Sequence, residues 1–393
     1  MPGRPGPRGA RRRSTTVTER DDSVHIVFGA TGAIGRAVVT ELLRAGRDVR
    51  AVSRGGQAPD GAQGVAAGAA DPAQAARAAA GAAVLYHCAS PPYTRWPGLF
   101  PALTGSILGA AESRGAKLVF AGNLYAYGPV DGPLREDLPA AARGRKGRTR
   151  AGMAAQLLGA HRDGRARVVI GRAWDYYGPH GPGSTAGQTV FGPILAGQKP
   201  QWPGRADQPH TFHYLPDIAR GLLILAGRPE AGGQVWHLPA AGPLTAQQLF
   251  DMIAEAAGQP VPVRARAASP ALLAAAGLFS PLLREMRETA YQFQAPFVIG
   301  ASKFEAAFGQ LQPTPHRDAV PRTVAWYRSR RPQATAQRAI RPVSPAAAAA
   351  TRWRLNAQNS QLCTALAVTR TKPTSAPIGG SSRCVRPVIR YVG

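Results

Sequence analysis

The spacing of three glycines near the amino terminus constrains the fold of this chain more than any other feature. The segment Phe28–Gly35 reads Phe-Gly-Ala-Thr-Gly-Ala-Ile-Gly; it follows an apolar run typical of a strand and opens a helical pattern. Gly29 permits a tight turn, Gly32 lets a ligand approach the backbone, and Gly35 lets helix and strand pack closely. This order predicts a diphosphate site at the start of the helix, where free amides and the helix dipole favour anions. A Gly-rich turn without a ligand is the alternative.

Short apolar strands alternate with helical patterns after this loop, which is typical of a parallel sheet with helices on both faces. Beyond residue 175 the sequence changes to Gly- and Pro-rich loops. We therefore expect an α/β fold, a doubly wound parallel sheet of six strands with a smaller C-terminal cap over its carboxyl edge. Five of these strands have bounds, at 24–28, 49–52, 83–87, 117–121 and 166–170, and the helices are 34–45, 99–114, 151–161, 216–225, 246–257, 270–278 and 281–293.

The strong positive charge is concentrated at the two ends of the chain. There are 48 Lys and Arg residues against 22 Asp and Glu residues; residues 1–20 hold six of the basic residues and residues 331–393 hold ten. These ends lack aromatic residues interleaved at useful spacing, which argues against nucleic acid as a partner. No stretch approaches the roughly 18 consecutive apolar residues of a membrane span. Three widely spaced cysteines without a metal-ligand pattern fit a reducing cytoplasm.

The end of the second expected strand bears on the choice of cofactor. A site for NAD normally has Asp or Glu there, which accepts hydrogen bonds from the ribose hydroxyls. This chain has Ser53 and Arg54 instead. A guanidinium can pair bidentately with a 2′-phosphate, the Ser53 hydroxyl can donate to it, and Arg36 can assist, so we expect NADP rather than NAD. The alternative is that both arginines are simply solvated.

Several motifs together resemble the extended and atypical short-chain dehydrogenase/reductases, a superfamily that includes NAD-dependent epimerases and dehydratases. The resemblance spans residues 24–330 and implies a Rossmann fold, with Ala89 and Ser90 beside the nicotinamide. It rests on the glycine loop, Cys88-Ala89-Ser90, Tyr125-Ala126-Tyr127-Gly128-Pro129, the segment 172–179 and Tyr214-Leu215-Pro216-Asp217-Ile218-Ala219. The residues expected to hold the cofactor are Gly29, Ala30, Thr31, Gly32, Ala33, Ile34, Gly35, Arg36, Ser53, Arg54, Ala89, Ser90 and Arg150.

The chain departs from the superfamily at all three of its usual reactive positions. Active members use a Ser or Thr and a Tyr-x-x-x-Lys arrangement, in which the Lys lowers the Tyr pKa and holds ribose. Here Asn123 stands where Ser or Thr is expected, and Lys146 and Arg150 replace the Tyr and the Lys. Asn123 can still hydrogen-bond a carbonyl and Arg150 can still contact ribose, but arginine does not donate a proton at neutral pH.

Lys146, or a phenol from Tyr127 or Tyr177, could replace the missing acid or base. Lys146 could do so if burial beside Arg148 and Arg150 lowered its pKa, because like charges disfavour the protonated form. The alternative is an exposed basic patch at a helix start. Tyr127 could supply a phenol from another loop, although an aromatic residue after a strand more often packs. The histidines lack metal-ligand spacing, so we expect no metal.

We expect the chain to divide into four segments. These are a flexible basic arm at 1–22, an NAD(P)-binding domain at 23–177, a mixed region at 178–330 that completes the sheet and forms the substrate cap, and a disordered basic tail at 331–393.

The sequence leaves three hypotheses about function. The first hypothesis is an oxidoreductase or epimerase/dehydratase-like enzyme acting on a small hydroxyl or carbonyl compound. The second is a catalytically silent NADP-binding protein with a redox-sensing or regulatory role. The third, binding of nucleic acid or an anionic surface through the tails, is the least favoured.

Overall fold

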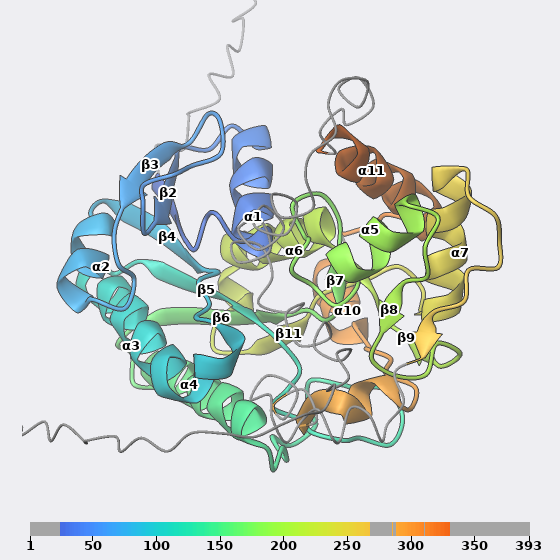
Figure 1. Cartoon of the computed structure of the whole chain (residues 1–393). Helices are drawn as coiled ribbons and strands as arrows, with labels where there is room; N and C mark the ends of the chain where they lie inside the picture. Colours follow the sequence, from blue (N-terminus) through green and yellow to red (C-terminus); the bar gives the residue numbers. More distant parts are fainter. Residues whose placement is uncertain (1–23, 268–284, 286–287, 310, 331–393) are drawn as a thin grey trace, which may run out of the picture.

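The computed structural model describes residues 24–267, 285, 288–309 and 311–330 (Figure 1). The basic arm expected at 1–22 and the basic tail expected at 331–393 lie outside these residues. The helix expected at 270–278 also lies outside them, as do six residues of the one expected at 281–293.

A parallel sheet of seven strands forms the centre of the molecule, in the order β11-β6-β5-β4-β1-β2-β3. The α/β class and doubly wound sheet are therefore confirmed, whereas the expected number of six strands is wrong. The sequence analysis located neither β3, a mostly exposed edge strand with one β-branched residue, nor β11, which has three residues. The strands are β1 (Val24–Phe28), β2 (Val49–Ser53), β3 (Gln63–Ala66), β4 (Ala82–His87), β5 (Lys117–Gly122), β6 (Arg167–Arg172) and β11 (Val235–His237).

Helices cover both faces of the sheet because the strand side chains alternate (Figure 1). In β1, Ile26 and Phe28 belong to a buried cluster with α3 and α4, whereas Val27 belongs to a second cluster with α1 and α6. The flanking helices are α1 (Ala33–Arg44), α2 (Pro72–Ala78), α3 (Trp96–Arg114), α4 (Arg145–Arg162) and α6 (Leu215–Gly227).

A third buried cluster joins α5 (Gln188–Leu195), α7 (Ala246–Ala257) and α11 (His316–Ser329), which stand together beside the sheet (Figure 1). The helix α7 has the bounds expected at 246–257; the capping box of Thr245 and Gln248 starts it, and Gly258, at φ 67°, ends it. The sequence analysis missed α5, α11 and α10 (Ser302–Phe308). The short elements are η1 (Tyr93–Arg95), β7 (Tyr176–Tyr177), β8 (Gln201–Trp202), β9 (Pro209–His210), β10 (His213–Tyr214), η2 (Pro229–Ala231), β12 (Leu244–Thr245), β13 (Arg266–Ala267) and η3 (Ala290–Phe293).

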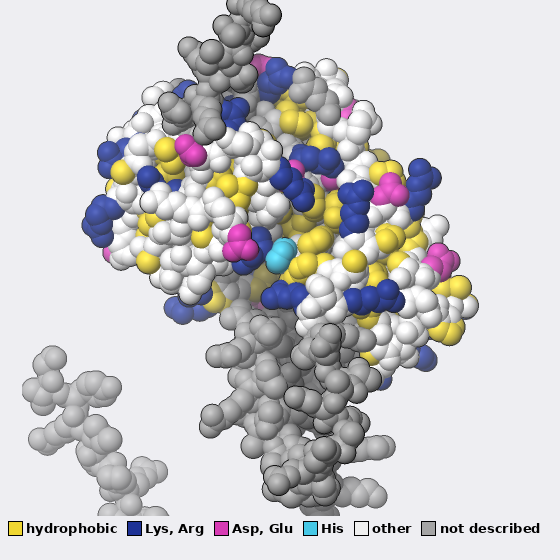
Figure 2. All heavy atoms as spheres, turned by 90° about the horizontal axis from the view of Figure 1, so that it is seen from above, with side chains coloured by type: hydrophobic (Ala, Val, Ile, Leu, Met, Phe, Trp, Pro, Cys, Tyr) yellow, Lys and Arg dark blue, Asp and Glu magenta, His cyan; other side chains and the backbone are white. Residues whose placement is uncertain are grey.

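The order of the strands reverses between β1 and β4, where the chain continues outward in opposite directions. In open α/β sheets such a switch point opens a crevice at the carboxyl ends of the strands, and ligands bind there. Seen from above, Lys and Arg side chains are spread over the molecule, and several border a hydrophobic area (Figure 2). Among the described residues, no helix combines the length and apolar character needed to cross a bilayer.

Candidate functional site

The glycine loop between β1 and α1 lies directly against the turn after β4. Gly29 has φ 80°, and a Cβ atom there would lie 2.5 Å from the Cα atom of Ala89. A Cβ atom at Gly35 would collide with the carbonyl oxygen of Gly29, whereas one at Gly32 would lie 3.3 Å from the same oxygen. Gly29 and Gly35 therefore serve the close packing of backbone on backbone, and Gly32 marks the open side of the loop.

The start of α1 is available to an anion. Gly32 is the N-cap residue, and no side chain of the described part of the chain caps the helix. Thr31 and Gly32 are exposed, and the Gly32 amide donates to Gly29 O at 3.0 Å, which holds the turn. The first-turn amides of a helix have no carbonyl partner within it, so a diphosphate fits the residues present.

The residues expected to select NADP lie in different surroundings. Arg54 is exposed at the end of β2, as a residue contacting a 2′-phosphate must be. Ser53 is buried and its hydroxyl donates to Gln57 O at 2.9 Å, so donation to a phosphate would require it to exchange that partner. Burial, then the positive charges of Arg36 and Arg330, lower the pKa of His180 to about 4. Arg36 therefore lies near the segment after β7.

The turn after β4 forms one wall of the crevice. Ala89 is partly exposed against Gly29, and Ser90 is exposed with its hydroxyl donating to Pro91 O at 3.2 Å. The Trp96 indole donates to the same carbonyl oxygen at 3.1 Å. The first residue of α3 therefore holds this turn through a hydrogen bond. It is the turn that we expected beside the nicotinamide.

Asn123 follows β5 and is oriented by its own loop. Its Oδ1 atom accepts a hydrogen bond from the Tyr125 amide at 3.3 Å. The NH₂ group of the Asn123 side chain remains as the donor, which suits a carbonyl or hydroxyl oxygen.

Lys146, in the first turn of α4, differs from both expectations made for it. Only 1% of the residue is exposed, so it is no surface patch. Its charged neighbour is the carboxylate of Glu285 rather than a group of arginines, and its Nζ atom donates to Tyr93 O at 2.7 Å. Arg148 is exposed and donates to Arg143 O instead. Lys146 is therefore the cation of a buried ion pair, because a segment remote in sequence supplies the carboxylate.

Arg150 lies one helical turn further along and is 8% exposed. Its guanidinium carbon lies 4.4 Å from the centroid of the Trp96 ring and 4.3 Å from that of Phe100. Burial lowers the pKa of Arg150 to about 9. Its Nε and Nη1 atoms have no hydrogen-bond partner among the described residues. A buried guanidinium with unpaired N–H groups is a site that hydroxyl or phosphate oxygens of a ligand would complete.

Tyr127 is not the free phenol that the sequence analysis considered. It is 2% exposed, its hydroxyl lies 2.8 Å from Nε2 of His237, and the guanidinium of Arg172 stacks 4.6 Å from its ring centroid. Burial raises its pKa. His237 belongs to β11 at the far edge of the sheet from the switch point. The Tyr127 phenol is thus buried and hydrogen-bonded within the core, which favours a packing role over a role as acid or base.

Two other tyrosines occupy the region beside Lys146. The Tyr93 hydroxyl lies 3.4 Å from the Tyr125 hydroxyl and 3.2 Å from Oγ1 of Thr289. The Nζ atom of Lys146 lies 3.8 Å from the centroid of the Tyr93 ring. Burial raises the pKa of both phenols, so they are neutral donors near pH 7. Tyr93, Tyr125 and Thr289 are distant from one another in the sequence, so no local pattern indicates that their hydroxyl groups meet.

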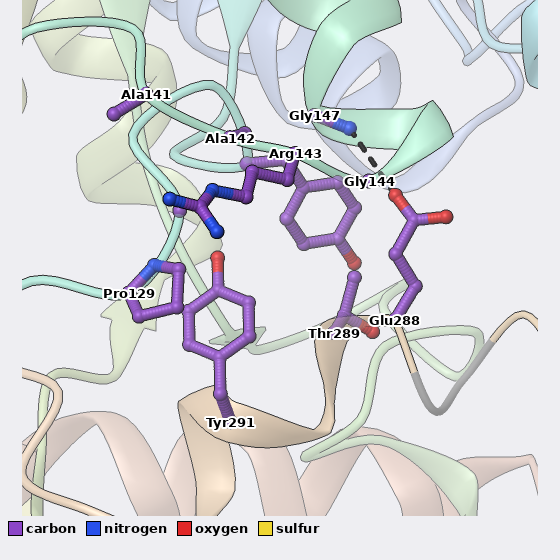
Figure 3. Close-up of a pocket in the computed structure, with 11 residues that line it drawn as sticks. Pro129, Ala141, Ala142, Arg143, Gly144, Gly147, Glu288, Thr289 and Tyr291 are labelled. Carbon is purple, nitrogen blue, oxygen red and sulfur yellow. Dashed lines mark hydrogen bonds between the residues drawn. The ribbon is translucent and has the colours of Figure 1, made fainter.

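A cavity of about 470 Å³ opens next to this network (Figure 3). Its polar lining comes from Tyr125, Arg143, Glu288, Thr289 and Tyr291. Glu288 accepts hydrogen bonds from the Lys146 amide at 2.6 Å and the Gly147 amide at 3.4 Å. The sequence analysis missed Arg143, Glu288 and Tyr291 as site residues, because no motif surrounds them. No cluster of His, Cys, Asp or Glu within the described part of the chain could hold a metal ion.

Comparison with known proteins agrees with the fold of this chain. The model of the NAD dependent epimerase/dehydratase family matches residues 25–238. No curated protein matches the sequence significantly.

Solved structures match most of the chain in fold. MoeE5, in complex with UDP-glucose and NAD, is 21% identical over 78% of this chain and 99% of its own, with a TM-score of 0.64. The dTDP-glucose 4,6-dehydratase DesIV of Streptomyces venezuelae, with NAD and TYD bound, is 20% identical over 78% and 98%, with a TM-score of 0.64. The UDP-glucose 4-epimerase of Thermotoga maritima, with UDP-glucose, is 16% identical over 78% and 99%, with a TM-score of 0.65.

Proposed function

Because this chain belongs to the NAD dependent epimerase/dehydratase family, whose model matches more than half of it, we propose that it is an NADP-dependent oxidoreductase or epimerase/dehydratase-like enzyme. Its substrate is a small compound with a hydroxyl or carbonyl group. When bound, the nicotinamide accepts or supplies a hydride. The glycine loop holds the diphosphate on the first turn of α1, and the turn with Ala89 and Ser90 borders the nicotinamide.

The buried guanidinium of Arg150 carries this proposal. It occupies the helical position at which the superfamily has a ribose-binding lysine, and its Nε and Nη1 atoms have no partner among the described residues. A guanidinium offers donors only, so hydroxyl oxygens of a ribose suit it. This unsatisfied cation is easier to explain as part of a ligand site than as a contribution to stability.

Four side chains stand where the chemistry would take place. Asn123 offers its NH₂ group to a substrate oxygen. The phenols of Tyr93 and Tyr125, linked to each other and to Thr289, can hold or pass a proton at their hydroxyl oxygens. Lys146, as an ammonium group against the Tyr93 ring, orients that phenol. This arrangement replaces the Tyr-x-x-x-Lys pair with groups from two loops and one helix.

The same proposal assigns cofactor binding and substrate binding to different segments of the chain. Residues 23–177 supply the glycine loop, Arg54, Asn123 and Arg150, and residues 178–330 supply Glu288, Thr289 and Tyr291 of the cavity. The first segment would therefore bind the cofactor and the second would cap the substrate.

Calorimetric titration of the full chain with NADPH and NADH tests the cofactor assignment. We expect NADPH to bind more tightly, and Arg54→Asp to invert the order, because a carboxylate repels the 2′-phosphate and accepts from ribose hydroxyls. Arg77→Asp makes the same charge change at an exposed site on α2 and should leave the order unchanged. Absence of affinity for both nucleotides would reject the proposal.

A catalytically silent NADP-binding protein is the second candidate. The observation in its favour is the burial of Lys146 in an ion pair with Glu285, because this pairing engages the side chain considered as the replacement acid or base. A screen of alcohols and carbonyl compounds at the nicotinamide absorbance separates the two. Turnover that Lys146→Ala abolishes without weakening NADPH binding would exclude the silent protein.

A further inference from the structure

The cavity beside the Tyr93–Tyr125 network has a distinct cationic end. Arg143 lies in the loop before α4, and its guanidinium points into the cavity beside the hydroxyl of Tyr291 (Figure 3). Arg143 is exposed, and no described residue forms an ion pair or a side-chain hydrogen bond with its guanidinium. The positive charge of Arg143 is therefore available to bind a ligand.

Tyr291 adds a second donor at this end. Its hydroxyl oxygen accepts a hydrogen bond from Nε2 of Gln292 at 3.0 Å, which leaves the O–H hydrogen to donate elsewhere. A guanidinium has donors and no acceptor. Two donors side by side, one of them charged, suit an oxyanion better than a neutral or cationic group.

The carboxylate that also lines the cavity does not cancel this charge. Glu288 accepts from the amides of Lys146 and Gly147 at the start of α4, so it is held by the positive end of that helix. Lys146 is paired with Glu285. Arg143 is thus the cation of the cavity lining without a partner in the described residues.

The other end of the cavity leads to the groups assigned to the reaction. Tyr125 lines the cavity and its hydroxyl lies 3.4 Å from that of Tyr93, while Thr289 lies 3.2 Å from the same Tyr93 hydroxyl. Pro129, Ala141 and the tyrosine rings supply apolar walls between the two ends. The volume, about 470 Å³, is within the range of small-molecule sites.

We propose that this cavity is the substrate subsite and that the substrate carries an oxyanion, a carboxylate or a phosphate, which Arg143 and Tyr291 bind. The reacting hydroxyl or carbonyl then points toward Tyr125. This assignment of the substrate class rests on the proposed function, but the binding of an anion at Arg143 does not.

Titration of the full chain with phenyl phosphate, benzoate and benzyl alcohol tests the subsite, since the three probes share a ring and differ in charge. We expect at least one of the two anions to bind at least about tenfold more tightly than the alcohol. Arg143→Gln should remove this advantage, and Tyr291→Phe should reduce it. Arg145→Gln removes a neighbouring exposed charge outside the cavity lining and should change affinity less than about twofold. The stronger of the two anions identifies the oxyanion as phosphate or carboxylate.

Two results would overturn the subsite: equal binding of the alcohol and both anions, or equal losses in Arg143→Gln and Arg145→Gln. Arg143→Lys, which keeps the charge without the planar fork, should retain part of the affinity if the variant chain is folded. NADPH titration of the same variants separates the two proposals. Absence of anion binding in the wild-type chain with NADPH binding intact rejects the subsite alone, whereas anion binding that depends on Arg143, without any nucleotide affinity, rejects the proposed function alone.

Discussion

The ammonium group of Lys146 lies over the ring of Tyr93, with Nζ 3.8 Å from the ring centroid, and donates a hydrogen bond to the Tyr93 carbonyl oxygen at 2.7 Å. This contact joins the start of α4 to the segment after β4. It brings Lys146, which the sequence comparison places at the position expected for the superfamily's reactive tyrosine, against a phenol from a different loop. The cation is therefore positioned to orient that phenol rather than to replace it.

Lys146 and Glu285 should show coupled effects on stability. Lys146→Met leaves the Glu285 carboxylate without its cation in a largely buried place, so we expect a loss of about 1–3 kcal/mol in the free energy of unfolding. Adding Glu285→Gln removes the unpaired charge and should restore part of that loss. Urea denaturation of the wild type, the two single variants and the double variant measures the coupling. Strict additivity of the single effects would contradict the ion pair.

Arg150 should separate ligand affinity from stability. Because its Nε and Nη1 atoms lack partners in the described structure, Arg150→Met removes a buried charge at little or no cost to the free energy of unfolding. NADPH affinity should fall by about tenfold or more, since charge-assisted hydrogen bonds are lost. Calorimetry and urea denaturation of the same preparation give both quantities. Arg145→Met serves as the control at an exposed position of the same helix, and unchanged NADPH affinity in Arg150→Met would contradict the assignment.

Replacement of Gly32 should weaken binding of the diphosphate, whereas replacement of Gly35 should lower the stability of the fold. Gly32 has φ −73°, and an added Cβ atom meets only Gly29 O at 3.3 Å, so Gly32→Ala should fold with near wild-type stability. The methyl group would stand on the open side of the loop and block the diphosphate. Gly35→Ala should destabilise the fold itself, because its Cβ atom collides with the Gly29 carbonyl.

Thermal unfolding with and without NADPH distinguishes the two glycines, and Gly109→Ala, which meets no atom within 4 Å, is the control. An unaltered shift of the melting temperature by NADPH in Gly32→Ala would argue against a diphosphate at this loop.

His87 should make the protein less stable in acid. Burial, then the charge of Arg150, lower the pKa of His87 to about 3, whereas an unfolded histidine titrates near pH 6.5. Between these values only the unfolded chain binds the proton, so stability is full above pH 6.5 and decreases as the pH falls toward 3. For one such group the loss between pH 7 and pH 5 is about 2 kcal/mol.

Urea denaturation at pH 7 and pH 5 measures this loss, which His87→Gln should reduce. Burial lowers the pKa of His237 to about 3 as well, so part of the dependence should remain. An identical pH dependence in the wild type and the variant would show that His87 does not contribute.

The secondary structure could be predicted where its signal is local. The strands β1, β2, β4, β5 and β6 are apolar runs, and α7 carries its own capping box. By contrast, α5 and α11 contain Pro193 and Pro321, which disfavour a helix locally, and both helices pack in the third cluster.

The sequence by itself determined the glycine loop and the class of sheet, because a tight turn, a close backbone contact and a helix start depend on neighbouring residues. The tertiary structure decided which of the candidate side chains have hydrogen-bond partners within the protein. Tyr127 meets His237 from 110 residues away and Lys146 meets Glu285 from 139 residues away, whereas Arg150 meets no hydrogen-bond partner for two of its nitrogen atoms among the described residues. Partners so far apart in the sequence produce no local or periodic pattern from which their contact could be predicted, because only folding brings them within hydrogen-bond distance.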